Sequence, residues 1–161
     1  GYYFEDQHHD LDKFVGEWEG IGFGNHLWRV HIIVLKKANY YDSYWYDALG
    51  LELSITKNGK ACITPTDSFL PGTSFIRGGG FIWDREKSSL QLDVYRMPFF
   101  YGKADKPYQE LANVLLCLNA AHDTIVVRRS HLVGIDRPVI IPDYLSVPYD
   151  AEVCTLRRVK K

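Results

Sequence analysis

The chain has 161 residues, a formal net charge of -1 and 46% hydrophobic residues. This composition is typical of one soluble globular domain covering residues 1–161, and it excludes disordered and collagen-like chains. No apolar run is long enough for a membrane span, and the short basic end at residues 157–161 lacks the broad basic face of a nucleic-acid-binding protein, so neither a membrane span nor a nucleic-acid partner is expected.

The cellular compartment is left open by the sequence. The chain begins at Gly1 and not at Met, so we expect a processed N-terminus or one left by cloning, compatible with a secreted, periplasmic or cytoplasmic protein. Cys62, Cys117 and Cys154 all lie in apolar alternating segments, which favours buried thiols over a disulfide framework, although one pair could close.

Helix signals are scarce and strand signals are frequent. Residues 5–15 predict a turn or two of helix that ends at Gly16, and residues 106–113 carry a second, weaker helix signal. Elsewhere apolar residues recur with a period of two, which indicates strands. In chain order the expected strands are residues 16–23, 26–37, 51–56, 60–64, 74–84, 88–97, 111–119, 124–133 and 152–159.

The turns between these strands favour an antiparallel meander that closes on itself. Asn58-Gly59 lies between two alternating runs and is a strong hairpin signal. Closure is the only arrangement of such a meander that removes its two edges, and the glycines at 78–80 favour the sharp coiling that closure needs. We therefore predict an all-β fold, an antiparallel up-and-down closed barrel of about 8–10 strands with a short N-terminal helical turn; a nine-strand sandwich is the alternative.

One long segment without strand character precedes the last strand. Residues 134–151 contain three prolines and two tyrosines. Loops of this length are often lids or binding loops, but the segment could equally be a strap that crosses one end of the barrel and delivers the last strand.

The first expected strand opens with Gly16-Glu17-Trp18, directly after the predicted helical turn. In this the chain resembles the calycin superfamily, in particular lipocalins and lipocalin-like bacterial domains, over residues 11–22 and the last strand. The chain lacks a Thr-Asp-Tyr motif and a long helix before that strand, so the resemblance is to an outlying member. It implies that Trp18 packs across the closed end of a barrel, against Arg157 or Arg158. Such a cation on an indole contributes roughly 0.5–2 kcal/mol.

The leading functional hypothesis is binding of a small hydrophobic or aromatic molecule inside the barrel. Alternate residues of a barrel strand face inward, and both 28, 30, 32, 34 and 90, 92, 94 are purely apolar series. Aromatic clusters at 40–46 and 99–101 fall between expected strands, where they would form the mouth opposite Trp18 or fold inward as a plug. The expected ligand-binding residues are Trp28, Val30, Ile32, Trp45, Tyr46, Leu92, Val94 and Phe100.

Two other functions are compatible with the sequence. The aromatic loops could bind another protein. Alternatively, the mixed polar faces of the strands could line the lumen of a cofactor-free isomerase, cyclase or dehydratase, with a histidine as proton shuttle, Asp or Tyr as its partner and Arg holding an oxyanion. That enzyme would use His31, His131, Asp93, Tyr95, Arg29 and Arg129. Polar strand residues are usually exposed, which favours a solvated exterior for this set.

No cofactor or metal is expected. Adjacent side chains diverge in His8-His9-Asp10, and His26 and His31 differ in strand parity, so neither set converges on an ion. The hydrolase, redox and zinc-enzyme motifs are absent from the sequence.

Overall fold

The structure is a computed structural model that describes residues 2–41, 44–63, 76–77, 79–103, 106–130 and 143–159. These residues are mostly in strands, and the helices among them are 3-10 turns of three residues each. The strands are β1 (Tyr2–Phe4), β2 (Gly16–Ile21), β3 (Leu27–Tyr41), β4 (Tyr44–Lys57), β5 (Lys60–Ile63), β6 (Ile76–Arg77), β7 (Gly80–Asp84), β8 (Ser89–Lys103), β9 (Lys106–Leu118), β10 (Thr124–Ser130) and β11 (Glu152–Arg158). The 3-10 helices are η1 (Asp12–Phe14), η2 (Phe23–Asn25) and η3 (Asp143–Leu145).

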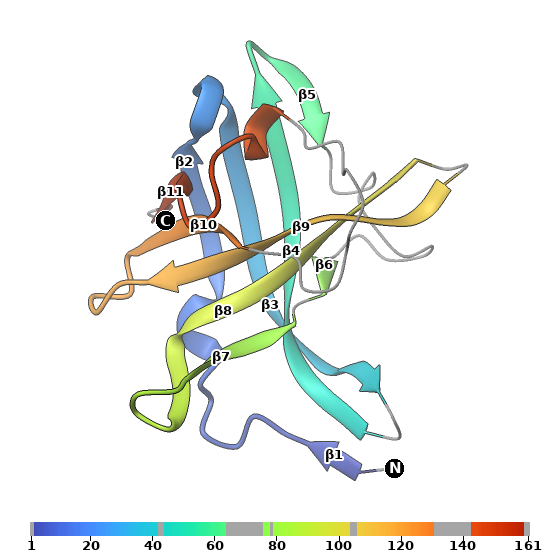
Figure 1. Ribbon diagram of the computed structural model, residues 1–161, viewed down its shortest axis with the longest axis vertical. Coiled ribbons are helices and arrows are strands. Elements are labelled where there is room, and N and C mark those ends of the chain that lie inside the picture. Colours follow the sequence, from blue (N-terminus) through green and yellow to red (C-terminus); the bar gives the residue numbers. More distant parts are fainter. Residues whose placement is uncertain are drawn as a thin grey trace.

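All the described strands belong to one sheet, which curls into a half-barrel (Figure 1). Its hydrogen-bonded order is β1-β4-β3-β2-β11-β10-β9-β8-β7, with β5 and β6 also paired to β4. Every pairing is antiparallel except that of β1 with β4. The predicted all-β, mainly antiparallel sheet is confirmed, and it is one sheet and not the two of a sandwich.

The predicted closed barrel is wrong for the described strands. β6 pairs with β4 through only two residues, and β7, which begins at Gly80, pairs instead with β8. β6 contacts β8 as well as β4, and the Gly79 amide donates to the Arg96 carbonyl at 2.9 Å, but no ladder of strands joins β4 to β7 among the described residues.

Both predicted helical segments differ in the structure. Over residues 5–15 only η1 is helical, and residues 106–113 belong to strand β9, paired with β8 from Lys103↔Lys106 onward. The weak helix propensity of residues 106–113 is overridden there by pairing along a long hairpin, because tertiary context outweighs local preference.

The core lies on the concave side of the half-barrel and follows strand parity. Trp28, Val30 and Ile32 of β3 are 1%, 4% and 0% exposed, and they pair with Ile55, Leu53 and Leu51 of β4, which are equally buried. The prediction that this apolar face of β3 points inward is confirmed. One continuous cluster of buried side chains extends from here across β8, β9, β10 and β11.

Residues 143–151 form a strap, which is one of the two interpretations of the long segment. Tyr144, Leu145 and Val147 are buried, and the ring of Tyr144 packs edge-on against Trp28 at the end of the core. Arg129 of β10 fixes the strap, because its Nη1 donates to the Val147 carbonyl at 2.5 Å and its guanidinium lies 4.4 Å from the ring centre of Tyr149. Residues 134–142 lie outside the described part of the chain.

Candidate functional site

The members of the predicted catalytic set that the structure describes do not come together. Arg29 and His31 lie exposed on the outer face of β3, where they pair with Glu19 at 3.1 Å and Glu52 at 3.8 Å. The solvated-exterior interpretation of this face is therefore confirmed for β3.

The other members of the catalytic set have separate surroundings. Asp93 is exposed on β8, whereas Tyr95 is buried in the core, where its hydroxyl accepts a hydrogen bond from the Leu49 amide and burial raises its pKa to about 12. Arg129 holds the strap, and His131 lies outside the described residues.

The predicted ligand-binding residues also separate into groups. Trp28, Val30 and Ile32 are covered by their core neighbours. Leu92 is 38% exposed and Val94 half-buried, because a bulge in the β7–β8 pairing shifts the inward positions to Tyr95 and Met97. The inward placement of Leu92 was thus a wrong prediction. Phe100 belongs to β8, but its side chain lies outside the described part.

The two aromatic clusters do not form one mouth opposite Trp18, as the sequence had suggested. Both belong to long hairpins and not to loops between strands. Gly16, the first residue of β2, pairs with Ile32, so residues 33–41 of β3 extend beyond the start of β2. The closed end of the β3–β4 hairpin therefore lies on the same side of the sheet as Trp18. The closed end of the β8–β9 hairpin lies on the other side of the sheet (Figure 1). Its open end, at Leu118, lies beside the start of β10 at Thr124, and β11 connects that start with Trp18 through Arg157 and Arg158.

An exposed aromatic surface marks the end of the β3–β4 hairpin, where β1 lies in parallel beside β4. We use the name aromatic lip for the three exposed aromatic residues at this end, which are Phe4, Trp45 and Tyr46. Phe4 and Tyr46 are direct neighbours in the ladder, and their rings stack with centres 5.3 Å apart and planes 12° from parallel. They are 52% and 38% exposed. Trp45, also 38% exposed, belongs to the opposite face of the hairpin, because successive residues of a strand alternate.

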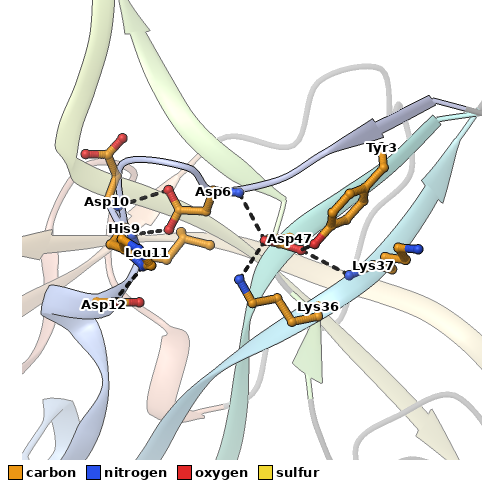
Figure 2. A network of polar contacts seen from close by, with 9 residues as sticks. All are labelled: Tyr3, Asp6, His9, Asp10, Leu11, Asp12, Lys36, Lys37 and Asp47. Carbon is orange, nitrogen blue, oxygen red and sulfur yellow. Dashed lines mark hydrogen bonds and ion pairs between the residues drawn. The ribbon is translucent and has the colours of Figure 1, made fainter.

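A network of polar contacts around a buried carboxylate, that of Asp47, lies next to the lip in the sequence of β1 and β4 (Figure 2). The Asp47 side chain is 1% exposed and accepts four hydrogen bonds. The donors are the Tyr3 hydroxyl at 2.5 Å, the Asp6 amide at 3.0 Å, and the Lys36 ammonium and Lys37 amide, both at 3.1 Å. β1 is thereby tied to both strands of the hairpin.

The charge of this carboxylate is stabilised by its donors. Burial raises the pKa of Asp47, but the hydrogen bonds from Tyr3, Asp6, Lys37 and Lys36 outweigh burial and lower the pKa to about 2. The same contact with Asp47 raises the pKa of Tyr3 to about 12. Asp47 is therefore ionised and Tyr3 neutral at neutral pH.

The segment after β1 is also held firmly. The Asp6 carboxylate accepts hydrogen bonds from the amides of Asp10 and Leu11, both at 2.9 Å, and Leu11 is buried in the core. His9 pairs with Asp12 at 3.2 Å, so this histidine takes part in a local turn. The described residues contain no group of three or more His, Cys, Asp and Glu side chains that could hold a metal ion.

Trp18 lies in a clasp at the same end of the sheet. The guanidinium of Arg158 lies 4.2 Å from the ring centre of Trp18 and donates to the carbonyls of Val15, Lys13 and His122. Arg157 instead pairs in register with Glu19. Gly16 is required here, because its φ is +139° and a Cβ atom would lie 2.6 Å from Arg158 Nη1.

Sequence reasoning missed Tyr3, Phe4 and Asp47. A signal was present, since three aromatic residues, Tyr2-Tyr3-Phe4, precede the acidic segment, but nothing local indicates that they pair with β4 more than forty residues away. Comparison with protein-family models, with curated proteins and with solved structures gives no match to this chain. Among the described residues no helix has the length and apolar character to cross a membrane.

Proposed function

We propose that this protein is a binding module that recognises a partner macromolecule through the aromatic lip. The observation that carries the proposal is the exposed, stacked pair of Phe4 and Tyr46 at the edge of the sheet. Aromatic residues are enriched at protein interfaces, since their rings offer large contact areas with few torsions to immobilise.

The network around Asp47 supports this proposal. An isolated three-residue parallel strand would be frayed, yet β1 is held through Tyr3 and Asp6 to a carboxylate that also binds Lys36 and Lys37. A surface ordered before binding loses less conformational entropy on association, which increases affinity. The hydrogen bonds around Asp47 are thus consistent with a binding surface that is ordered before the partner binds.

Site-specific photo-crosslinking tests the proposal in cells that make the protein. A photoreactive phenylalanine replaces Tyr46 in one variant and Trp83, which is 56% exposed on β7 at the other end of the sheet order, in the control. We expect a discrete crosslinked product from position 46 that is weak or absent from position 83. Equal crosslinking from both positions would contradict recognition by the lip.

A small apolar or aromatic molecule is a second candidate ligand, on the concave side of the sheet. It is supported by half-buried Val34 and Phe81, which extend the apolar core surface. With it we propose that the chain is an outlying relative of the calycins that has a half-barrel in place of their closed barrel, and the clasp between Trp18 and Arg158 supports that relationship.

Native mass spectrometry of the protein purified from its own source tests this second candidate. Bound ligand would appear as a defined mass above that of the chain, lost on denaturation. A single unliganded species, together with no binding of apolar fluorescent probes, would exclude it without affecting recognition through the lip.

A further inference from the structure

The sheet ends at β1 with one edge of its backbone unoccupied by the described strands. β1 is the last strand of the hydrogen-bonded path, and β4 is its single neighbour there. An edge strand presents N–H and C=O groups that can pair with an extended segment of another chain. Successive side chains of such a segment point to opposite faces of the sheet, so each face of β1 selects every second residue of the segment.

The surroundings of β1 are apolar on one side and acidic beyond its end. Phe4 and Tyr46 share one face. Glu5, the next residue, is exposed, and its negative charge contributes to the raised pKa of Lys36 and of Tyr3. Residues 1–12 contain Glu5, Asp6, Asp10 and Asp12 but no lysine or arginine.

A cation already lies against β1, on the face opposite Phe4 and Tyr46. The ammonium of Lys37 lies 4.9 Å from the ring centre of Tyr3, on the strand next to β1's partner. A lysine or arginine of an added strand would be attracted by the exposed Glu5 carboxylate, which follows the end of β1.

We infer that the partner of the aromatic lip is an extended peptide segment in which apolar and basic residues alternate, added beside β1. This inference rests on the proposed function. Its apolar residues would lie on Phe4 and Tyr46, and its basic residues would face Glu5. A second copy of this chain fits less well, because pairing β1 with another β1 would bring two acidic segments together.

Fluorescence anisotropy with labelled octapeptides tests the inference. One peptide alternates valine with arginine, and the two matched peptides carry serine or glutamate in place of arginine. We expect the Val–Arg peptide to bind more tightly than the Val–Ser peptide and the Val–Glu peptide not to bind. Glu5→Gln should weaken Val–Arg binding about two- to fivefold, as expected for loss of a surface ion pair. Glu86→Gln, which removes an exposed acid from the turn between β7 and β8, should leave it unchanged.

The other outcomes separate the inference from the proposed function. Equal binding of Val–Arg and Val–Ser, lost in Phe4→Ala, would overturn the basic partner but leave the lip as a binding surface. Equal weakening by Glu5→Gln and Glu86→Gln would show long-range attraction and overturn the inference. No binding of any peptide would overturn it too, and the crosslinking at position 46 would then decide the proposed function. A dimer of the protein that Phe4→Ala abolishes would identify a second copy of the chain as the partner of β1 and would contradict the inference of a basic peptide.

Discussion

Asp47 is the residue that joins β1 and the segment after it to the β3–β4 hairpin. It is buried on the hairpin, and its four hydrogen bonds reach β1, the following segment and both lysines of β3. Burial of a carboxylate with fewer hydrogen-bond donors would cost free energy of folding, so we expect the loss of one contact to weaken the whole network.

Asp47→Asn should therefore destabilise the protein. The amide keeps the size of the side chain but loses the charge that Tyr3 and Lys36 bind, and hydrogen bonds to charged groups contribute about 1.5–3 kcal/mol each. We expect a loss of about that size in the free energy of unfolding in urea. Asp93→Asn, the same change at an exposed carboxylate, is the control and should be nearly neutral. Equal effects of the two would contradict the role of Asp47.

The same residue makes stability depend on pH. The pKa of Asp47 is lowered in the folded protein from its ordinary 3.8 to about 2. Its contribution is fully present above the unfolded-state value and is lost as pH falls through the folded-state value. The stability difference between wild type and Asp47→Asn should thus shrink between about pH 4 and pH 2, measured by urea unfolding at each pH. A constant difference would rule out titration of Asp47.

Arg158 is the second residue with a distinct prediction. Lysine keeps its charge but cannot reach the three carbonyls that the guanidinium binds while stacking on Trp18. We expect Arg158→Lys to lower the unfolding free energy by about 1–3 kcal/mol. Arg157→Lys, one position away and exposed, should be close to neutral by the same denaturation assay. If Arg157→Lys were the more damaging change, the clasp would be misassigned.

At the scale of elements, the strands were predictable and their ends were not. Alternation in residues 26–37 and the Asn58-Gly59 turn indicate β3 and the β4–β5 hairpin, because period and turn chemistry are local. The extension of β3 to Tyr41 and the bulge in β8 depend on partner strands far along the chain. Trp28, Val30 and Ile32 were therefore placed correctly and Leu92 was not.

The strap gives a prediction at this scale. Arg129 links β10 to residues 147–151 through the Val147 carbonyl, the Tyr149 ring and backbone bonds with Asp150 and Ala151. Arg129→Gln should loosen that segment without unfolding the sheet, so limited proteolysis should cut within residues 143–151 faster than in wild type. Arg96→Gln, at an exposed position on β8, is the control. Unchanged cleavage in Arg129→Gln would show that burial of Tyr144 and Leu145 alone holds the strap.

For the whole molecule, the fold class followed from the sequence and the candidate site did not. Nine runs of alternating residues predict the mainly antiparallel sheet, although they favoured a closed barrel over the half-barrel observed. The calycin resemblance of Gly16-Glu17-Trp18 implies a clasp of Trp18 with Arg157 or Arg158, and Arg158 is the arginine that lies on the ring. The lip arises from long-range pairing of Tyr3 and Phe4 with β4, which no local pattern indicates. The predicted catalytic residues failed to converge because Arg29 and His31 face outward while Tyr95 faces the core.

The most direct measurement of the central claim is the crosslinking yield from position 46 relative to position 83, with and without Asp47→Asn. If a fixed lip recognises the partner, the substitution should reduce the yield at position 46 severalfold and leave position 83 unchanged. An undiminished yield at position 46 would show that the Asp47 network does not prepare the surface. Equal yields from the two positions in wild type would show that the lip is not the recognition site.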